Sequence, residues 1–322
     1  MPARLPLSSQ RLVVVTGKGG VGKSAVAAAL SRAAAAGRRR VLAVEIGCGR
    51  LGTLLGAGRG GLEPRPVSPG LALATVEPEE ALGDFVHRIL RLRMLSRRLL
   101  ESTSFQVLAA AAPGLPEFLV LQKLHTWLSA RRLGRRVYDL IVVDAPASGH
   151  SLPLLAAPRT LGALARLGPV GDTLRAVGAT LADPATTLVC IVSTPEELAV
   201  RETIELHREL ADRLGLPVGP AIVNAVPPRR FSRGDEELIA RLEAAGERHP
   251  ERHPQQHPRG HPWIAAARFM LERRGEAVAQ VQALRRALGT APVRLPFLFA
   301  GPEAEGGIDI LARTLAHAVL AA

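Results

Sequence analysis

Short apolar runs recur along the chain, and most are followed by a longer segment whose apolar residues return with helical spacing. Brief runs rich in valine, leucine and isoleucine are typical of strands that are buried on both faces of a sheet. We expect such strands at residues 11–16, 41–45, 69–76, 138–144, 187–192, 220–226 and 293–295. Because strands that alternate with helices build parallel sheets, residues 1–322 are predicted to form one α/β domain: a mostly parallel, doubly wound sheet with helices on both faces.

The predicted helices differ in composition. Residues 25–36 are rich in alanine and leucine, and Gly37 is placed to end that helix. Helical periodicity also covers about 79–134, which predicts a helical subdomain with an apolar face and an arginine-rich face. The arginine face is interpreted as solvated, with binding to a membrane surface as the alternative. Further helices are expected at 265–288 and 309–320.

A repeat of His-Pro dipeptides occupies about 247–262. Proline at every fourth residue is incompatible with a helix, so this stretch is predicted to be a loop insertion. Metal ligation by its regularly spaced histidines is the less favoured alternative, because no cysteine or acidic cluster accompanies them.

The strand at 11–16 leads into a glycine-rich loop that fits the phosphate-binding pattern G-x-x-x-x-G-K-[ST] without a mismatch. In such loops, backbone N–H groups and the N-terminus of the following helix hold phosphate oxygens. Lys23 is expected to reach the β- and γ-phosphates of ATP, and the Ser24 hydroxyl to ligate Mg²⁺. The predicted nucleotide-binding residues of the loop are Gly17, Gly19, Gly20, Val21, Gly22, Lys23 and Ser24.

The strand at 138–144 ends in Asp144, at the sheet edge where ligands bind in open parallel sheets. A carboxylate in this place can hold Mg²⁺ through a water molecule, so Asp144 and Ser24 are the predicted metal-binding residues. The loop that follows contains Pro146 and Gly149, and it is predicted to be a switch that senses the γ-phosphate.

Four ordered motifs resemble one family. A second lysine, Lys18, gives the loop the deviant form K-G-G-x-G-K-S. The segment D-A-P-A-S-G-H-S begins at Asp144, T-P-E-x-x-x-x-x-E-T begins at Thr194, and the strand at 220–226 contains Asn224. Together they resemble the ArsA-like ATPases, the anion-transporting and tail-anchored-protein-targeting branch of the deviant Walker A P-loop ATPases. The resemblance extends from Val13 to about residue 315.

This resemblance implies a homodimer in which Lys18 crosses the interface and contacts the partner subunit's nucleotide. It implies that Asn224 reads the adenine edge and that the loop at Pro296 closes over the base. It also implies coupling of the nucleotide state to a client or a membrane-associated partner protein, with the helices of 79–134 as a candidate client groove. Packing of this apolar stripe into the core is the favoured interpretation. The expected catalytic residues are Lys18, Lys23, Glu45 and Asp144.

The sequence departs from the family at the strand 41–45. Relatives place an aspartate at the end of this strand and a further aspartate two residues on, which helps to orient the attacking water. Here these positions are Glu45 and Gly47. Slow hydrolysis is therefore expected. The alternatives are a nucleotide-locked scaffold module with little turnover and a positioning ATPase, similar to ParA and MinD, on a membrane or DNA.

Composition narrows these alternatives. The formal net charge is +12, carried almost entirely by arginine, and is interpreted as compositional bias rather than as a nucleic-acid footprint. Aromatic residues are only 3% of the chain, and no specific nucleic acid is expected as a partner. Cys48 and Cys190 stand far apart, which argues against a thiolate metalloid site and favours a cytoplasmic location.

Overall fold

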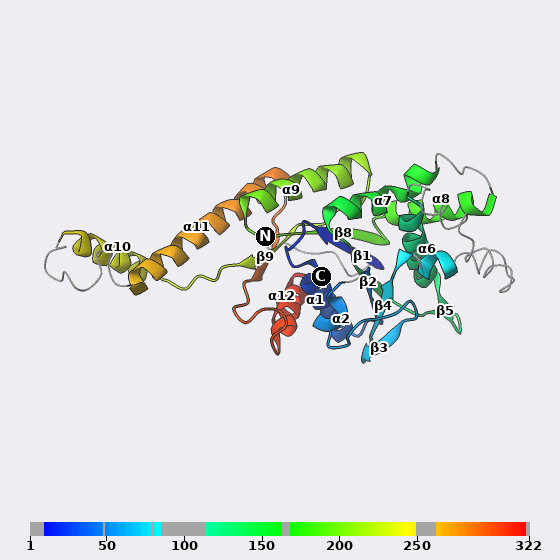
Figure 1. Cartoon of the computed structure of the whole chain (residues 1–322), viewed down its shortest axis with the longest axis horizontal. Coiled ribbons are helices and arrows are strands. Elements are labelled where there is room, and N and C mark those ends of the chain that lie inside the picture. Colours follow the sequence, from blue (N-terminus) through cyan, green and yellow to red (C-terminus); the bar gives the residue numbers. More distant parts are fainter. Residues whose placement is uncertain are drawn as a thin grey trace.

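The computed structural model describes residues 10–47, 49–78, 80–84, 114–162, 168–248 and 262–319. Its centre is an eight-stranded sheet in the order β10-β9-β8-β1-β7-β2-β4-β3 (Figure 1). The strands are β1 (Leu12–Gly17), β2 (Val41–Ile46), β3 (Arg65–Ser68), β4 (Leu71–Val76), β7 (Leu140–Asp144), β8 (Thr187–Ser193), β9 (Ile222–Val226) and β10 (Val293–Pro296). Only β3, at one edge, pairs antiparallel with its neighbour.

Helices cover both faces of this sheet. One face packs against α1 (Lys23–Ala36), the short α2 (Leu51–Leu54) and α12 (Gly307–Val319). The other face packs against α6 (Leu115–Ser129), α7 (Ser148–Gly162) and α8 (Gly168–Ala182). Six of the eight alanines of α1 are buried, so this helix lies close beneath the strands and brings its N-terminus to the end of β1. The predicted α/β fold is confirmed.

A helical arm extends from the β9 side of the sheet (Figure 1). It is formed by α10 (Arg233–Arg248) and α11 (Pro262–Leu288). Its base packs against α9 (Glu197–Arg208), which also contacts β8 and continues as the π-helix η1 (Glu209–Arg213). Val200 of α9 and Val281 of α11 share a small core with Val223 of β9, and this core fixes the base of the arm. Of the predicted His-Pro loop, residues 249–261 lie outside the described residues, whereas residues 247–248 end α10 and Pro262 begins α11.

The region predicted as a helical subdomain, 79–134, is only partly described. Its described helix α6 is not separate from the main core, because Phe118, Leu121 and Leu124 are buried with side chains of the central strands. The predicted helicity up to Gly134 is wrong at its end: α6 stops at Ser129, and β5 (Arg131–Arg132) pairs antiparallel with β6 (Arg135–Arg136). The subdomain itself stays a prediction.

Two more elements were not expected. These are β3, at one edge of the sheet, and the short α2, which follows β2. Both are four residues long, too short for periodicity to reveal them. None of the described helices has the length and apolarity needed to cross a membrane.

Candidate functional site

The phosphate-binding loop lies at the carboxyl end of β1, packed against β8 and β9. A Cβ atom on Gly17 would lie 2.2 Å from the carbonyl oxygen of Val192, and Gly17 has φ of +146°. At Gly22, with φ of +89°, a Cβ would lie 2.3 Å from Nδ2 of Asn224. Both positions therefore require glycine, because backbone or side-chain atoms of neighbouring strands occupy the space of a side chain. The loop is held in one shape by these contacts.

The loop opens directly into the N-terminus of α1. Gly22 is the N-cap residue, no side chain accepts a hydrogen bond from the first turn, and that turn carries no acidic residue. The first N–H groups of a helix lack intrahelical partners and carry partial positive charge. This arrangement is the one that holds phosphate groups in other proteins.

Lys23, Ser24 and Asp144 converge at this point. The Lys23 Nζ donates to the carbonyl oxygen of Lys18 at 2.9 Å. Burial lowers the pKa of Lys23, and the charge of Asp144 opposes that shift. Burial raises the pKa of Asp144 to about 6, although a hydrogen bond from Ser24 and the charge of Lys23 pull the pKa down; the charge of Glu45 adds to the rise. A buried carboxylate beside a serine hydroxyl is chemically suited to Mg²⁺.

Glu45 lies beside Asp144 in the parallel register of β2 and β7, and it is only 2% exposed. Its Oε1 accepts a hydrogen bond from the backbone N–H of Leu51 at 2.7 Å, so the carboxylate caps α2. Gly47 has φ of +74°, and its N–H donates to the carbonyl of Val76 at 3.0 Å. The turn after β2 thus gives a structural reason for glycine at position 47. The catalytic role of Glu45 stays a prediction.

Lys18, expected to reach a partner subunit, is paired within its own chain. Its Nζ lies 2.8 Å from Oε1 of Glu202 on α9, and each side chain is about one third exposed, at 32% and 35%. Glu202 is not among the residues predicted to act at the site. The available signal was the second glutamate of the T-P-E-x-x-x-x-x-E-T motif, but nothing in the sequence placed it next to a residue 184 positions away.

Asn224 lies in the middle of β9, and Pro296 ends the neighbouring strand β10. The Asn224 Nδ2 donates to the carbonyl oxygen of Val21 at 3.0 Å, which ties β9 to the phosphate-binding loop. Pro296 pairs with Val226, and the N–H of Phe297 donates to the Val226 carbonyl at 3.0 Å. A cavity of about 630 Å³ opens beside these strand ends. Its lining includes Thr194, Ala225, Arg230, Phe269, Phe297 and Phe299. Adenine recognition by Asn224 and Pro296 stays a prediction.

A buried hydrogen bond that the sequence analysis missed links the site to the predicted switch. Thr16 Oγ1, at the end of β1, lies 2.6 Å from Ser151 Oγ in the first turn of α7. Both residues are fully buried, so a displacement of α7 relative to β1 would break this contact. His150, the neighbouring histidine of the D-A-P-A-S-G-H-S motif, is exposed.

Thiolate chemistry is not favoured at the described cysteine. Cys190 is completely buried in β8, and burial raises the pKa of its thiol to about 12. Within the described ranges, no group of three or more histidine, cysteine, aspartate or glutamate side chains is placed to hold a metal ion. Cys48 lies outside those ranges.

A buried parallel strand, a glycine loop, a helix N-terminus and the Lys23, Ser24 and Asp144 cluster together define a P-loop nucleoside triphosphatase. Comparison with known proteins agrees. Residues 10–168 match the family described as anion-transporting ATPase. The ATPase BagA of Mycobacterium tuberculosis is 35% identical over 246 residues, which cover 73% of this chain and 70% of that protein.

More distant relatives include an arsenical pump-driving ATPase of Acidiphilium multivorum, 26% identical over 82% of this chain and 49% of that protein. A protein of the same name from Escherichia coli is 26% identical over 68% of this chain and 40% of that protein. This chain thus spans half or less of the length of these two pump ATPases. The chain belongs to the ArsA family of anion-transporting ATPases, and this membership identifies it as an ATPase.

Proposed function

We propose that this protein is a Mg²⁺-dependent, homodimeric ATPase that couples its nucleotide state to a client or a membrane-associated partner protein in the cytoplasm. The observation that carries the proposal is the convergence of Lys23, Ser24 and Asp144 at the N-terminus of α1. The residues present fit ATP and Mg²⁺: α1 offers free backbone donors for phosphate, and Asp144 is a buried carboxylate that accepts a hydrogen bond from Ser24 and lies near Lys23.

Each residue has a distinct task in this proposal. Lys23 and the backbone of Gly19 to Gly22 would hold the phosphates of ATP, while Ser24 and Asp144 would hold Mg²⁺, Asp144 through a water molecule. Bound Mg²⁺ would neutralise charge on the β- and γ-phosphate oxygens. Asn224 and the Pro296 loop would hold the base beside the cavity at the ends of β9 and β10.

Lys18 supplies the argument for a dimer. In its own subunit it is held by Glu202 and remains about one third exposed at the surface. We propose that this ion pair orients the lysine outward, so that it meets the nucleotide of a second subunit. A positive charge placed there would act where the transferred phosphoryl group gains negative charge.

One pair of variants tests these roles together. Lys23→Ala should abolish binding of an ATP analogue in calorimetry, because the two other lysines of the chain are Lys18, held by Glu202, and Lys123, held by Asp84. Lys18→Ala should bind the analogue but lose analogue-dependent dimerisation in light scattering and about 10²–10³-fold in turnover. Unchanged affinity in the first variant, or an analogue-bound monomer in the wild type, would contradict the proposal.

The second candidate is a nucleotide-locked scaffold with little turnover. It is favoured by two observations: Glu45 is engaged in capping α2, and Gly47 offers no carboxylate. The space around position 47 is open, so Gly47→Asp introduces no clash, and aspartate tolerates a positive φ at a cost of about 1 kcal/mol. If water orientation is what limits a slow enzyme, Gly47→Asp should raise the steady-state rate by about 10²-fold or more, whereas Gly47→Asn should not.

A further inference from the structure

The hairpin β5–β6 has a sequence that its own fold does not explain. It reads Arg131-Arg132-Leu133-Gly134-Arg135-Arg136, and all six residues are exposed. The pairing sets Arg131 opposite Arg136 and Arg132 opposite Arg135. Like charges directly opposite each other destabilise a sheet, so both cross-strand pairs work against the hairpin.

The turn at the tip is equally unfavourable in isolation. Leu133 and Gly134 have φ of +49° and +75°, the left-handed conformation of a two-residue hairpin turn. Asparagine or aspartate is the usual first residue of such a turn, because a left-handed backbone strains a bulky side chain. Leu133 is nevertheless leucine, and it is 97% exposed. The protein holds an apolar side chain in a strained conformation where it contacts water.

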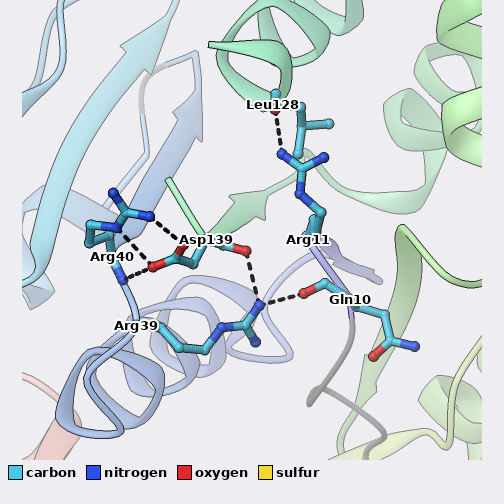
Figure 2. Close-up of polar contacts among 6 residues, drawn as sticks. All are labelled: Gln10, Arg11, Arg39, Arg40, Leu128 and Asp139. Atoms are coloured by element: carbon cyan, nitrogen blue, oxygen red, sulfur yellow. Dashed lines mark hydrogen bonds and ion pairs between the residues drawn. The ribbon is translucent and has the colours of Figure 1, made fainter. Parts of the chain in front are cut away.

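The base of the hairpin is firmly attached to the sheet. The N–H of Val137 donates to the carbonyl of Ala130, and the N–H of Asp139 donates to the carbonyl of Arg40. Figure 2 shows polar contacts of the residues that flank it in the sequence: Arg11 donates to the carbonyl of Leu128 at the end of α6, and Arg40 pairs with Asp139. The tip is thus presented from a rigid base rather than from a loose segment.

Positive charge dominates this edge of the molecule. None of the described carboxylates forms an ion pair with the four hairpin arginines. Arg11 and Arg39 donate to backbone carbonyl oxygens, and the charge of Asp139 acts on both (Figure 2). The pKa of Arg11 is lowered by burial and further by the charges of Arg136 and Arg131, although the charge of Asp139 opposes the shift.

We propose that the β5–β6 hairpin docks the protein on an anionic lipid surface, with Leu133 inserted at the boundary of headgroups and acyl chains. Arginines near such a surface are attracted by the lipid charge, and an apolar tip gains by leaving water. The same contacts would relieve the repulsion between the paired arginines. The phosphates of a nucleic acid could pair with the arginines, but they would give Leu133 no apolar surroundings. The tip also offers no aromatic ring for base stacking.

The hairpin directly precedes β7, so it lies at the end of the sheet where the parallel strands begin, that is, at their amino ends. The phosphate-binding loop lies at the opposite edge, where β1 ends. Docking through the hairpin would therefore leave the nucleotide site open, and we expect lipid binding that does not depend on ATP.

The test is co-sedimentation of the full chain with phosphatidylcholine vesicles, with and without about 30% phosphatidylglycerol. Binding is expected only to the anionic vesicles, with or without nucleotide, and weakened by high salt. The informative variant is Leu133→Asn: asparagine suits the turn, so thermal stability should be kept or raised while vesicle binding falls by about threefold or more.

Arg132→Gln with Arg135→Gln should lower vesicle binding by about tenfold or more. The matched control is Arg285→Gln with Arg286→Gln at the exposed end of α11, which removes the same charge elsewhere and should have much less effect. The proposal is overturned if neutral vesicles bind equally, if the two double variants behave alike, or if Leu133→Asn binds as the wild type does. It is also overturned if the hairpin variants lose binding to duplex DNA while vesicle binding is unchanged.

Discussion

Two aspartates stand at opposite ends of strand β7 in opposite electrostatic situations. Asp139, just before the strand, accepts hydrogen bonds from the Arg40 side chain and backbone, and these contacts lower the pKa of Asp139 to about 2. Asp144, the last residue of the strand, is 6% exposed, and burial raises its pKa to about 6. The charge of Asp139 is compensated by Arg40. The charge of Asp144 is offset only in part, by Ser24 and Lys23, at the edge where ligands bind in parallel sheets.

The two aspartates therefore contribute to stability with opposite signs. Asp139 stabilises the fold above its ordinary pKa of 3.8, and this contribution is lost as the pH falls towards 2. Asp144 binds its proton more tightly in the folded chain than in the unfolded chain, so its ionised form destabilises the fold at neutral pH. That cost is removed as the pH falls through about 6 towards 3.8. A buried carboxylate that destabilises the ligand-free protein is expected at a site where a bound cation would compensate its negative charge.

The largest effect should come from Asp144→Asn. Loss of the proposed magnesium-holding carboxylate should lower turnover by about 10²–10³-fold. At pH 7 the same variant should be more stable than the wild type by on the order of 1–3 kcal/mol, because a buried charge is removed. Urea denaturation and a steady-state phosphate-release assay measure the two effects. A variant that is both inactive and less stable would show that Asp144 serves the fold.

The next effect concerns pH. Divalent metals bind the deprotonated carboxylate, so Mg²⁺-dependent affinity for an ATP analogue should weaken below about pH 6, by up to tenfold per unit. Calorimetry between pH 5 and 8, with and without Mg²⁺, isolates the metal-dependent part. Asp144→Asn is the control, since its weaker binding should show a flat profile over the same range. An equally steep profile in that variant would assign the proton to another group.

The smallest effect is expected from Asp139→Asn. The Arg40 pair is partly exposed, so its loss should cost about 1 kcal/mol at pH 7 and leave turnover unchanged. The deficit should shrink as the pH is lowered from 4 to 2, because the wild-type carboxylate then becomes protonated too. Denaturation at several pH values measures this change. A loss of turnover in Asp139→Asn would mean that the two ends of β7 are coupled.

Much of the nucleotide site was predictable because it is local. A strand, a glycine loop and a helix that follow one another in the chain place Gly17, Lys23 and Ser24 together by local geometry alone. Asp144 was predictable for a related reason: parallel strands that end at one sheet edge bring their last residues together.

The pairings across long sequence separations were not predictable. Glu202 forms an ion pair with Lys18, which is 184 positions away in the sequence. Asn224 donates a hydrogen bond to the carbonyl of Val21, which is 203 positions away. Capping of α2 by Glu45 could not be foreseen, because α2 itself gives no periodic signal. The arginine hairpin was missed because arginine and leucine favour helices, and nothing local showed that residues 133 and 134 have left-handed backbones.

The sequence by itself determined the class of fold, the phosphate-binding loop and the family, because each depends on residues that are close in the chain or on a repeating apolar pattern. Only the tertiary structure decided which charges are matched. Strand register and helix packing gave Asp139 an arginine, buried Asp144 without enough positive charge, and exposed the arginine hairpin. These outcomes depend on burial and on through-space distance, and a linear sequence specifies neither until the chain has folded.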